Sequence, residues 1–309
     1  MKSIRSFLLP LGLVITLLAA CSIGTPRPAG AIVDDLGRSV NVKEVPQRII
    51  SLSPSNTEIL FALGLEDKVV GVTEYCNYPP EALNKAKVGG FSTPDIEIII
   101  SLQPDLILAD SIHAKKVIPA LEERGLIVFA LAPKNLDGIL QDIKVVGKIT
   151  GKEKEANELV RQMESRIKTI TDKTQKLPEK PNVFYILWHD PLWSAGLETL
   201  EQELIDKAGG NNIFQDIAGY KAVDLESVIA RNPEIIIACT GHGEAKDKPF
   251  EWAKSELRLG ATKARKNNRI YQVDADLVSR AGPRIVDALE WFAYFLHPEI
   301  FGKPKEVIK

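Results

Sequence analysis

Residues 95–109 read Asp-Ile-Glu-Ile-Ile-Ile-Ser-Leu-Gln-Pro-Asp-Leu-Ile-Leu-Ala, and residues 224–238 read Asp-Leu-Glu-Ser-Val-Ile-Ala-Arg-Asn-Pro-Glu-Ile-Ile-Ile-Ala. The two stretches align without a gap at a spacing of 129 residues. Each begins as a helical pattern, stops before a proline and continues as an apolar run of strand length. The repeat predicts one such helix–strand unit in each half of the chain, and it therefore favours two lobes of related structure.

Short β-rich runs alternate with helical patterns around the first copy of the repeat. A hairpin is expected at 32–42, with Gly37 in its turn. The β-rich runs lie at 48–53, 69–73, 105–109 and 126–131, and the helical patterns lie at 56–63, 94–102 and 114–124. Strand–helix alternation of this kind is typical of parallel βαβ units.

A long periodic segment follows the first lobe. From Lys152 to about Lys176 apolar residues recur along one face, which predicts a helix of about 25 residues, or roughly 38 Å. We expect Gly147 and Gly151 to interrupt the chain before this helix, and Pro178 to break it afterwards. The alternation then resumes, with strands expected at 182–187, 234–239 and 269–273 and helices at 199–208, 225–231 and 283–296.

These patterns together predict the fold class and the domain organisation. We expect an α/β fold of two Rossmann-like lobes, residues 32–150 and 178–309, with a ligand cleft between them. A single long helix at 151–177 is expected to join the two lobes.

The first 20 residues resemble a secretory signal. Basic residues precede an apolar segment that ends in small residues and is too short for a permanent anchor. The tetrapeptide Leu-Ala-Ala-Cys, which ends at Cys21, resembles the bacterial lipobox, in which the cysteine is acylated and becomes the mature N-terminus. An ordinary cleavage site with an incidental cysteine is the alternative. On the first hypothesis residues 21–31 form a tether, and lipid holds the protein at an extracytoplasmic membrane surface.

The composition excludes several classes of protein. With 39 basic and 41 acidic residues the chain has a net charge of −2, which becomes −4 without residues 1–20. A nucleic acid is therefore not expected as a partner. The motifs of serine hydrolases, P-loop proteins, zinc peptidases and CxxC redox proteins are absent, which favours a binding protein over an enzyme.

Aromatic residues and prolines collect where the predicted strands end. Examples are Tyr75, Phe91, Trp188, Trp193 and Tyr220. Ligands of open α/β sheets bind outside the carboxyl ends of the strands, so these loops are expected to line the cleft between the lobes. The pattern favours a large and partly apolar ligand, although each aromatic residue taken alone is also compatible with a place in the core or on the surface.

Glu97 and Glu226 occupy matching positions in the repeat, at the beginning of each helix. A carboxylate at this position is favoured by the helix dipole, so capping is one explanation. The other explanation is functional, because two equivalent acidic side chains, one on each lobe, would face a partner of matching two-fold symmetry that carries arginines.

Three segments carry a family resemblance. Residues 48–64, 71–82 and 102–107 resemble the substrate-binding proteins of ABC importers for cobalamin and iron chelates, and the likeness extends from about residue 46 to residue 296. The motifs Ser53-Pro-Ser-Asn-Thr-Glu58 and Tyr75-x-x-Tyr78-Pro-Pro80 are most similar to the cobalamin-binding branch. The resemblance implies a class III periplasmic binding protein, a rigid monomeric clamp with one connecting helix that docks on a permease with its ATPase and catalyses no reaction.

The resemblance also implies the site. Positions that contact the corrinoid in that branch match seven residues of this chain, which are Ser55, Tyr75, Phe91, Trp193, Tyr220, Asp276 and Arg280. Leu187 stands where the best-known cobalamin binder has an aromatic residue, and the docking positions match Glu97 and Glu226. Flat aromatic surfaces suit the faces of a corrinoid, and Asn56, Asp276 and Arg280 could bond its amide rim. Cobalamin would be the transported ligand, and no cofactor is expected.

Other interpretations stay open. His113, His189 and His242 each follow a predicted strand and could make a metal site with a carboxylate such as Asp190, although their spacing matches no metal motif. The ligand would then be a metal ion, haem or a ferric siderophore. A lipid-anchored extracytoplasmic enzyme is the alternative from another class of protein.

Cys76 and Cys239 lie in opposite lobes. A disulfide between them would staple the cleft and would require Cα atoms within about 7 Å. We expect two free thiols instead, with Cys239 packed at the end of an apolar strand.

Overall fold

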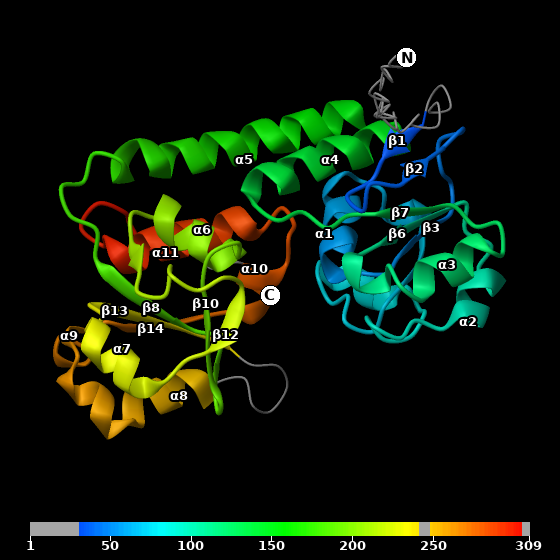
Figure 1. Cartoon of the computed structure of the whole chain (residues 1–309). Helices are drawn as coiled ribbons and strands as arrows, with labels where there is room; N and C mark the ends of the chain where they lie inside the picture. The colour runs from blue at the N-terminus through cyan, green and yellow to red at the C-terminus, as the bar shows by residue number, and fades with distance from the viewer. Residues whose placement is uncertain (1–30, 241–247, 305–309) are drawn as a thin grey trace, which may run out of the picture.

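The computed structural model describes residues 31–240 and 248–304, which form two α/β lobes side by side beneath a pair of helices (Figure 1). The expected fold class is therefore confirmed. The predicted signal at 1–20, the lipidation site Cys21, almost all of the tether and His242 lie outside the described residues. Among the helices described, none combines the length and the hydropathy that crossing a bilayer requires.

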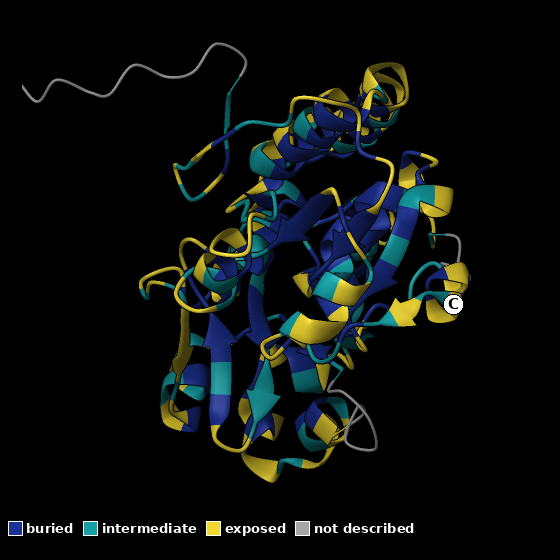
Figure 2. Ribbon diagram, turned by 90° about the vertical axis from the view of Figure 1, so that its right-hand side faces the viewer, coloured by how far each residue is buried: buried dark blue, intermediate teal, exposed yellow. Residues whose placement is uncertain are grey.

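The N-terminal lobe is built on a five-stranded parallel sheet. Its strand order is β5 (Ala86–Lys87), β4 (Val69–Val72), β3 (Ile49–Ser51), β6 (Leu106–Ala109) and β7 (Val128–Ala130). The central strands are buried on both faces, as the dark blue arrows of Figure 2 show, and they therefore read as continuous apolar runs. The helices are α1 (Pro54–Ala62), α2 (Ile96–Ser101) and α3 (Val117–Glu122), with 3₁₀ turns η1 (Glu66–Lys68), η2 (Pro80–Asn84) and η3 (Ser111–His113).

The expected N-terminal hairpin is present. It pairs β1 (Ile32–Val33) with β2 (Ser39–Val40) in antiparallel register. Gly37 lies in its turn with φ +77°, a conformation that side chains other than glycine rarely adopt.

The C-terminal lobe contains two sheets. The parallel sheet has the order β11 (Asn211–Asn212), β8 (Asn182–Ile186), β13 (Ile235–Cys239) and β14 (Ile270–Val273). Its helices are α6 (Leu200–Lys207), α7 (Leu225–Arg231), α8 (Lys248–Ser255), α9 (Lys263–Lys266), α10 (Ala275–Ser279) and α11 (Ile285–Leu296), with a 3₁₀ turn η5 (Leu257–Ala261). The second sheet is antiparallel and joins β12 (Tyr220–Ala222), β10 (Leu192–Ala195) and β9 (Trp188–His189). The sequence does not predict this sheet, because its strands are two to four residues long and lie among turn-forming residues.

The sequence repeat is a structural repeat. In one copy α2 leads into β6, in the other α7 leads into β13, and both strands lie inside their parallel sheet. Asp95 caps α2 and Asp224 caps α7, each by accepting the backbone N–H three residues further on. Gln103 and Asn232, which precede the two prolines, both have a positive φ, at +48° and +45°. The two lobes therefore share the same helix–strand unit, including its aspartate N-cap and the residue with positive φ before the proline.

Two antiparallel helices connect the lobes. The long helix that the periodicity predicts is present as α5 (Glu153–Thr174), and α4 (Leu136–Thr150) precedes it and packs along it (Figure 1). The backbone N–H of Leu136 donates to a carboxylate oxygen of Glu203 in α6 at 2.7 Å, so α4 also contacts the C-terminal lobe. The connection is therefore a two-helix brace, of which the sequence predicts only the second helix.

The two glycines near this connection have different roles. Gly147 lies inside α4, where a Cβ atom would stand 2.4 Å from the Cβ of Ala156 in α5. The expectation that Gly147 interrupts the chain is therefore wrong, since it permits close packing of the two helices. Gly151 does end α4, as its C-cap, with φ +70°.

Candidate functional site

The loops that follow four neighbouring strands of the N-terminal sheet open into one cavity. Residues 53–55 follow β3, residues 74–77 follow β4, residues 90–93 follow β5, and Asp110 follows β6. The C-terminal lobe supplies α10 and the two residues after it, so the cavity lies between the lobes. Its volume is about 550 Å³, which lies within the range of small-molecule sites.

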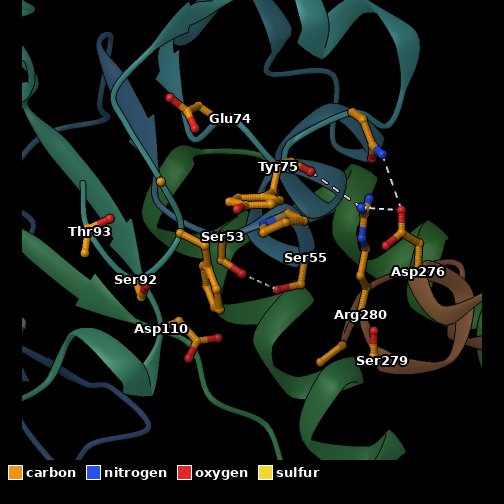
Figure 3. Close-up of a pocket in the computed structure, with 15 residues that line it drawn as sticks. Ser53, Ser55, Glu74, Tyr75, Ser92, Thr93, Asp110, Asp276, Ser279 and Arg280 are labelled. Atoms are coloured by element: carbon orange, nitrogen blue, oxygen red, sulfur yellow. Dashed lines mark hydrogen bonds and ion pairs between the residues drawn. The ribbon is translucent and has the colours of Figure 1, made fainter. Parts of the chain in front are cut away.

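Five of the seven residues predicted to contact the ligand line this cavity. They are Ser55, Tyr75, Phe91, Asp276 and Arg280, and Figure 3 labels all of them except Phe91. Tyr75 is 61% exposed and lines the cavity, which leaves its side chain accessible to a ligand. Pro54 and Ala281 add further apolar surface. The wall is therefore apolar in part, as the loop composition predicts.

Trp193 and Tyr220 do not line this cavity. They stand on neighbouring strands, β10 and β12, of the antiparallel sheet. Figure 1 places β12 on the side of the C-terminal lobe that is turned towards the N-terminal lobe. The structure therefore separates the predicted contacts into a group in the cavity and a pair on the sheet beside it.

The polar side chains of the cavity are acidic on balance. Glu74, Asp110 and Asp276 contribute carboxylates, and Arg280 contributes a cation. Arg280 donates to Asp276 at 2.5 Å, which leaves less of its charge available to a ligand. Ser53 and Ser55, which both line the cavity, are hydrogen-bonded to each other at 2.8 Å (Figure 3). The arrangement offers hydroxyl, amide and carboxylate partners, and it offers no excess of positive charge.

A buried carboxylate ties the two lobes together behind the cavity. Glu58 of α1, whose side chain is 2% exposed, accepts from Arg280 at 3.1 Å and from the Nε of Arg284 at 2.9 Å. The guanidinium of Arg284 also lies 3.8 Å from the centre of the Tyr78 ring. Asn77 donates to Asp276 across the same junction at 3.3 Å. Because both guanidinium groups come from the C-terminal lobe, these bonds hold the lobes in register.

Glu58 and Arg284 are site residues that the sequence analysis missed. Glu58 occupies a helix face that is otherwise buried, where a charged side chain requires a partner. A glutamate among residues of a helix that is expected to be buried is the sequence signal that could have identified Glu58. The sequence does not indicate which cation pairs with it.

Two polar residues expected in the cleft are engaged with the backbone instead. His113 is fully buried, its Nδ1 accepts from the backbone N–H of Asp110, and its Nε2 donates to the carbonyl oxygen of Phe91 at 2.6 Å. Both ring nitrogens are therefore used, and the hypothesis that His113 points into the cleft is wrong. Asn56 is also buried and donates to the carbonyl oxygen of Ala109, so it does not face the rim of a ligand. These residues hold the cavity loops in place.

The proposed histidine metal site finds no support among the described residues. In the ranges 31–240 and 248–304 no cluster of three or more histidine, cysteine, aspartate or glutamate side chains has the arrangement of a metal site. His189 lies on β9, where its ring contacts that of Trp188 at a centroid distance of 4.9 Å. Cys76 and Cys239 are both buried and unpaired, which confirms the expectation of two free thiols.

Glu97 and Glu226 are both exposed in the first turn of their helices. Figure 1 shows α2 and α7 on separate lobes, away from α4 and α5. The two surfaces differ in one respect, because Arg258 lies 3.6 Å from the Glu226 carboxylate. The structure thus presents one acidic side chain on each lobe, with a basic neighbour on the C-terminal lobe.

The comparison with known proteins agrees with this architecture. Residues 49–277 match the model of the periplasmic binding protein family. The chain belongs to the periplasmic binding protein family. The match covers both lobes, including both copies of the repeat and most of the cavity.

Three members of the family are especially similar. An uncharacterized ABC transporter substrate-binding lipoprotein, YvrC of Bacillus subtilis, is 35% identical over 87% of this chain and 86% of its own length. The crystal structure of the periplasmic vitamin B12 binding protein BtuF of Vibrio cholerae has 29% identity and a TM-score of 0.71, covering 82% of this chain and 98% of its own. The haem-binding protein RhuT of a Roseiflexus species has 28% identity and a TM-score of 0.71, with the same coverage of both chains. This chain is accordingly a substrate-binding protein of an ABC importer, and its relatives are binding proteins rather than enzymes.

Proposed function

We propose that this periplasmic binding protein captures a cobalamin-like corrinoid between its lobes and delivers it to a membrane permease without chemical change. The observation that carries the proposal is the cavity between the lobes, which combines apolar surface from Tyr75, Phe91 and Pro54 with three carboxylates. A corrinoid is a rigid ring with amide arms, so apolar surfaces can cover its faces and carboxylates can accept from its amides. A rigid ligand also loses little entropy on binding.

The charge of the cavity argues for this ligand over a polyanion. Glu74, Asp110 and Asp276 would repel a ferric siderophore rich in carboxylates or catecholates, and Arg280 is already paired with two carboxylates. Like charges at a binding surface cost affinity. The similarity to a vitamin B12 binding protein supports the same ligand.

Haem is the second candidate, and Tyr75 is the observation that favours it. Its phenol stands exposed at the cavity, where a tyrosine oxygen could ligate ferric iron. The similarity to haem-binding proteins supports this alternative. Coordination by His113 is not available, because both of its ring nitrogens are bonded to the backbone.

A binding titration separates the two ligands. The protein is titrated with cyanocobalamin, haemin and a ferric siderophore, and binding is followed by absorbance and calorimetry. We expect saturable binding of cyanocobalamin. Binding of haemin with an iron–phenolate absorption band that disappears in Tyr75→Phe would replace the corrinoid proposal, and so would binding of the siderophore alone.

The remaining parts of the proposal concern delivery. We propose that Cys21 carries lipid and holds the protein at an extracytoplasmic membrane surface, and that Glu97 and Glu226 dock on arginines of the permease. Both carboxylates are exposed, one on each lobe, as a two-fold partner would require. Charge reversal at both positions should leave ligand affinity unchanged and abolish uptake in cells that carry the permease. Unchanged uptake would contradict the docking role.

A further inference from the structure

Tyr220 is a partly exposed residue whose hydroxyl reaches a buried carboxylate. The residue is 45% exposed on the edge strand β12. Its hydroxyl donates inward to Oε2 of Glu201 at 2.8 Å. The carboxylate therefore restrains one end of a ring whose other surface is available to a ligand.

Glu201 is an unusual residue for its position. It lies in the first turn of α6, is 1% exposed, and shares its helix with the buried side chains of Leu204 and Ile205. Within residues 31–240 and 248–304 no basic side chain lies at ion-pair distance from it, and its side-chain partner is the hydroxyl of Tyr220. A buried carboxylate without a cation is expensive, and an apolar side chain would stabilise this site more. Stability therefore does not explain why a glutamate is present.

We propose that Glu201 is a positioning residue, whose carboxylate fixes the ring of Tyr220 on the side of the C-terminal lobe that faces the N-terminal lobe, and whose protonation loosens that ring and weakens ligand binding. The proposal rests on the proposed function, because it takes Tyr220 as a ligand contact beside the cavity.

The physical basis is the strength of the hydrogen bond in the two protonation states. Burial raises the pKa of Glu201 to about 7, against the opposing effect of its own backbone N–H and of Tyr220. An ionised carboxylate accepts a shorter and stronger hydrogen bond than a carboxylic acid does. The restraint on the ring is therefore strong above neutral pH and weak below it.

The titratable groups around Glu201 do not change charge in the same range. Tyr185 from β8 and Cys239 from β13 are buried, and burial raises the pKa of both, that of Cys239 to about 12. Burial likewise raises the pKa of Tyr220. The negative charges of Asp274 and Asp276, near the start of α10, also raise the pKa of Cys239. Of the three side chains whose pKa burial raises beside it, none titrates near neutrality, so Glu201 is the group of this set that exchanges a proton there.

One experiment tests this link without any ligand. Tyrosine labelled with ¹³C in the ring is incorporated into the full chain, which has six tyrosines, and the Tyr220 resonance is assigned with Tyr220→Phe. We expect the resonance to shift with a midpoint near pH 7, and the shift to vanish in Glu201→Gln. Asp206→Asn is the matched control, since Asp206 is an exposed carboxylate on the same helix that pairs with Lys180. A shift that persists in Glu201→Gln, or none in the wild type, overturns the proposal.

A second measurement tests the consequence for binding. Affinity for cyanocobalamin is measured at pH 6 and pH 8, and the wild type should bind about tenfold more tightly at pH 8, as expected for the loss of one charge-assisted hydrogen bond. Glu201→Gln and Tyr220→Phe should remove the pH dependence, and the double variant Glu201→Leu with Tyr220→Phe should bind no more weakly than either single variant. Equal wild-type affinity at the two pH values overturns the positioning role. If the Tyr220 resonance titrates but cyanocobalamin does not bind at either pH, the link between the two residues is supported and the proposed ligand is wrong.

Discussion

Among the described residues each lobe buries one glutamate, and the two lie in opposite surroundings. Glu58 of the N-terminal lobe is 3% exposed and meets two guanidinium groups of the other lobe. Glu201 of the C-terminal lobe is 1% exposed and meets a phenol of its own lobe. The first carboxylate holds the lobes together, and the second holds a proton near neutrality. The difference teaches that burial alone does not assign a role to an acidic residue, because the partner decides whether it stabilises or titrates.

The two lobes contribute different structural elements to the cleft. The N-terminal lobe lines the cavity with loops at the carboxyl ends of four parallel strands. The C-terminal lobe contributes α10 and adds a separate antiparallel sheet that carries Trp193 and Tyr220. The shared helix–strand unit is therefore a scaffold, and the chemistry of each wall comes from what each lobe adds to it.

Removal of the inter-lobe carboxylate should have the largest effect on stability. Glu58→Ala leaves Arg280 and Arg284 largely buried without this partner, so the free energy of unfolding should fall by about 3–5 kcal/mol. Urea denaturation at pH 7 measures the change, and Glu66→Ala, which removes an exposed acid nearby, should leave the midpoint almost unchanged. A loss below about 1 kcal/mol would mean that the lobes are held mainly by other contacts.

Replacement of Glu201, the second buried glutamate, should raise the free energy of unfolding, whereas replacement of Glu58 should lower it. Because burial raises the pKa of Glu201 from 4.5 to about 7, the folded state binds its proton more tightly than the unfolded state does. The contribution of Glu201 to the free energy of unfolding of the wild type therefore falls as the pH rises from 4.5 to 7, by roughly 3 kcal/mol at most.

Glu201→Gln should accordingly gain stability relative to the wild type between pH 5 and pH 8. Urea denaturation of both proteins at the two pH values measures the difference. The comparison between the two glutamates fails if the gain is the same at pH 5 and pH 8, since the group would then not titrate in the folded state over this range.

The two walls should contribute unequally to affinity. Tyr75→Ala removes an exposed ring of the cavity and should weaken cyanocobalamin binding about 30-fold, as truncation of a central aromatic contact does. Trp193→Ala acts outside the cavity, and we expect a loss of about threefold. Calorimetric titration of the two variants decides the order, and a larger loss for Trp193→Ala would move the main contact surface to the antiparallel sheet.

The smallest expected difference is between Glu97 and Glu226, the two carboxylates proposed to dock on the permease. Arg258 lies 3.6 Å from Glu226 and offsets part of its charge, whereas Glu97 forms no ion pair among the described residues. We expect Glu97→Ala to reduce uptake about fivefold and Glu226→Ala about twofold, in keeping with exposed charge pairs. Arg258→Ala should raise uptake slightly if the permease presents arginines. Reduced uptake in Arg258→Ala would assign that residue to docking instead.

Much of the fold follows from local pattern. The strands of both parallel sheets are apolar runs of strand length, the long helix α5 has a regular apolar face, and prolines and glycines mark the ends. The repeat predicted two related lobes because a helix, its acidic cap and the following strand are encoded within 15 residues. The cavity residues on the ends of the N-terminal strands could be predicted for the same reason, since strand ends are visible in sequence.

Other features depend on contacts between distant segments. The position of His113 after a strand predicts a place in the cleft, but its two ring nitrogens are hydrogen-bonded to the backbone of Asp110 and of Phe91. Gly147 is expected from the sequence to interrupt the chain, but it lies inside α4, where it allows close contact with α5. The pairing of Glu58 with Arg284 joins positions 226 residues apart. No local pattern contains such information.

The sequence by itself determined the two α/β lobes, the helix that spans them and the aromatic loops at the strand ends, because each is encoded by periodicity and turn chemistry over a few residues. Only the tertiary structure decided which polar groups face the cavity and which form hydrogen bonds inside the protein. Burial and partner set the charge and orientation of a side chain, and both arise when segments remote in the chain are brought into contact.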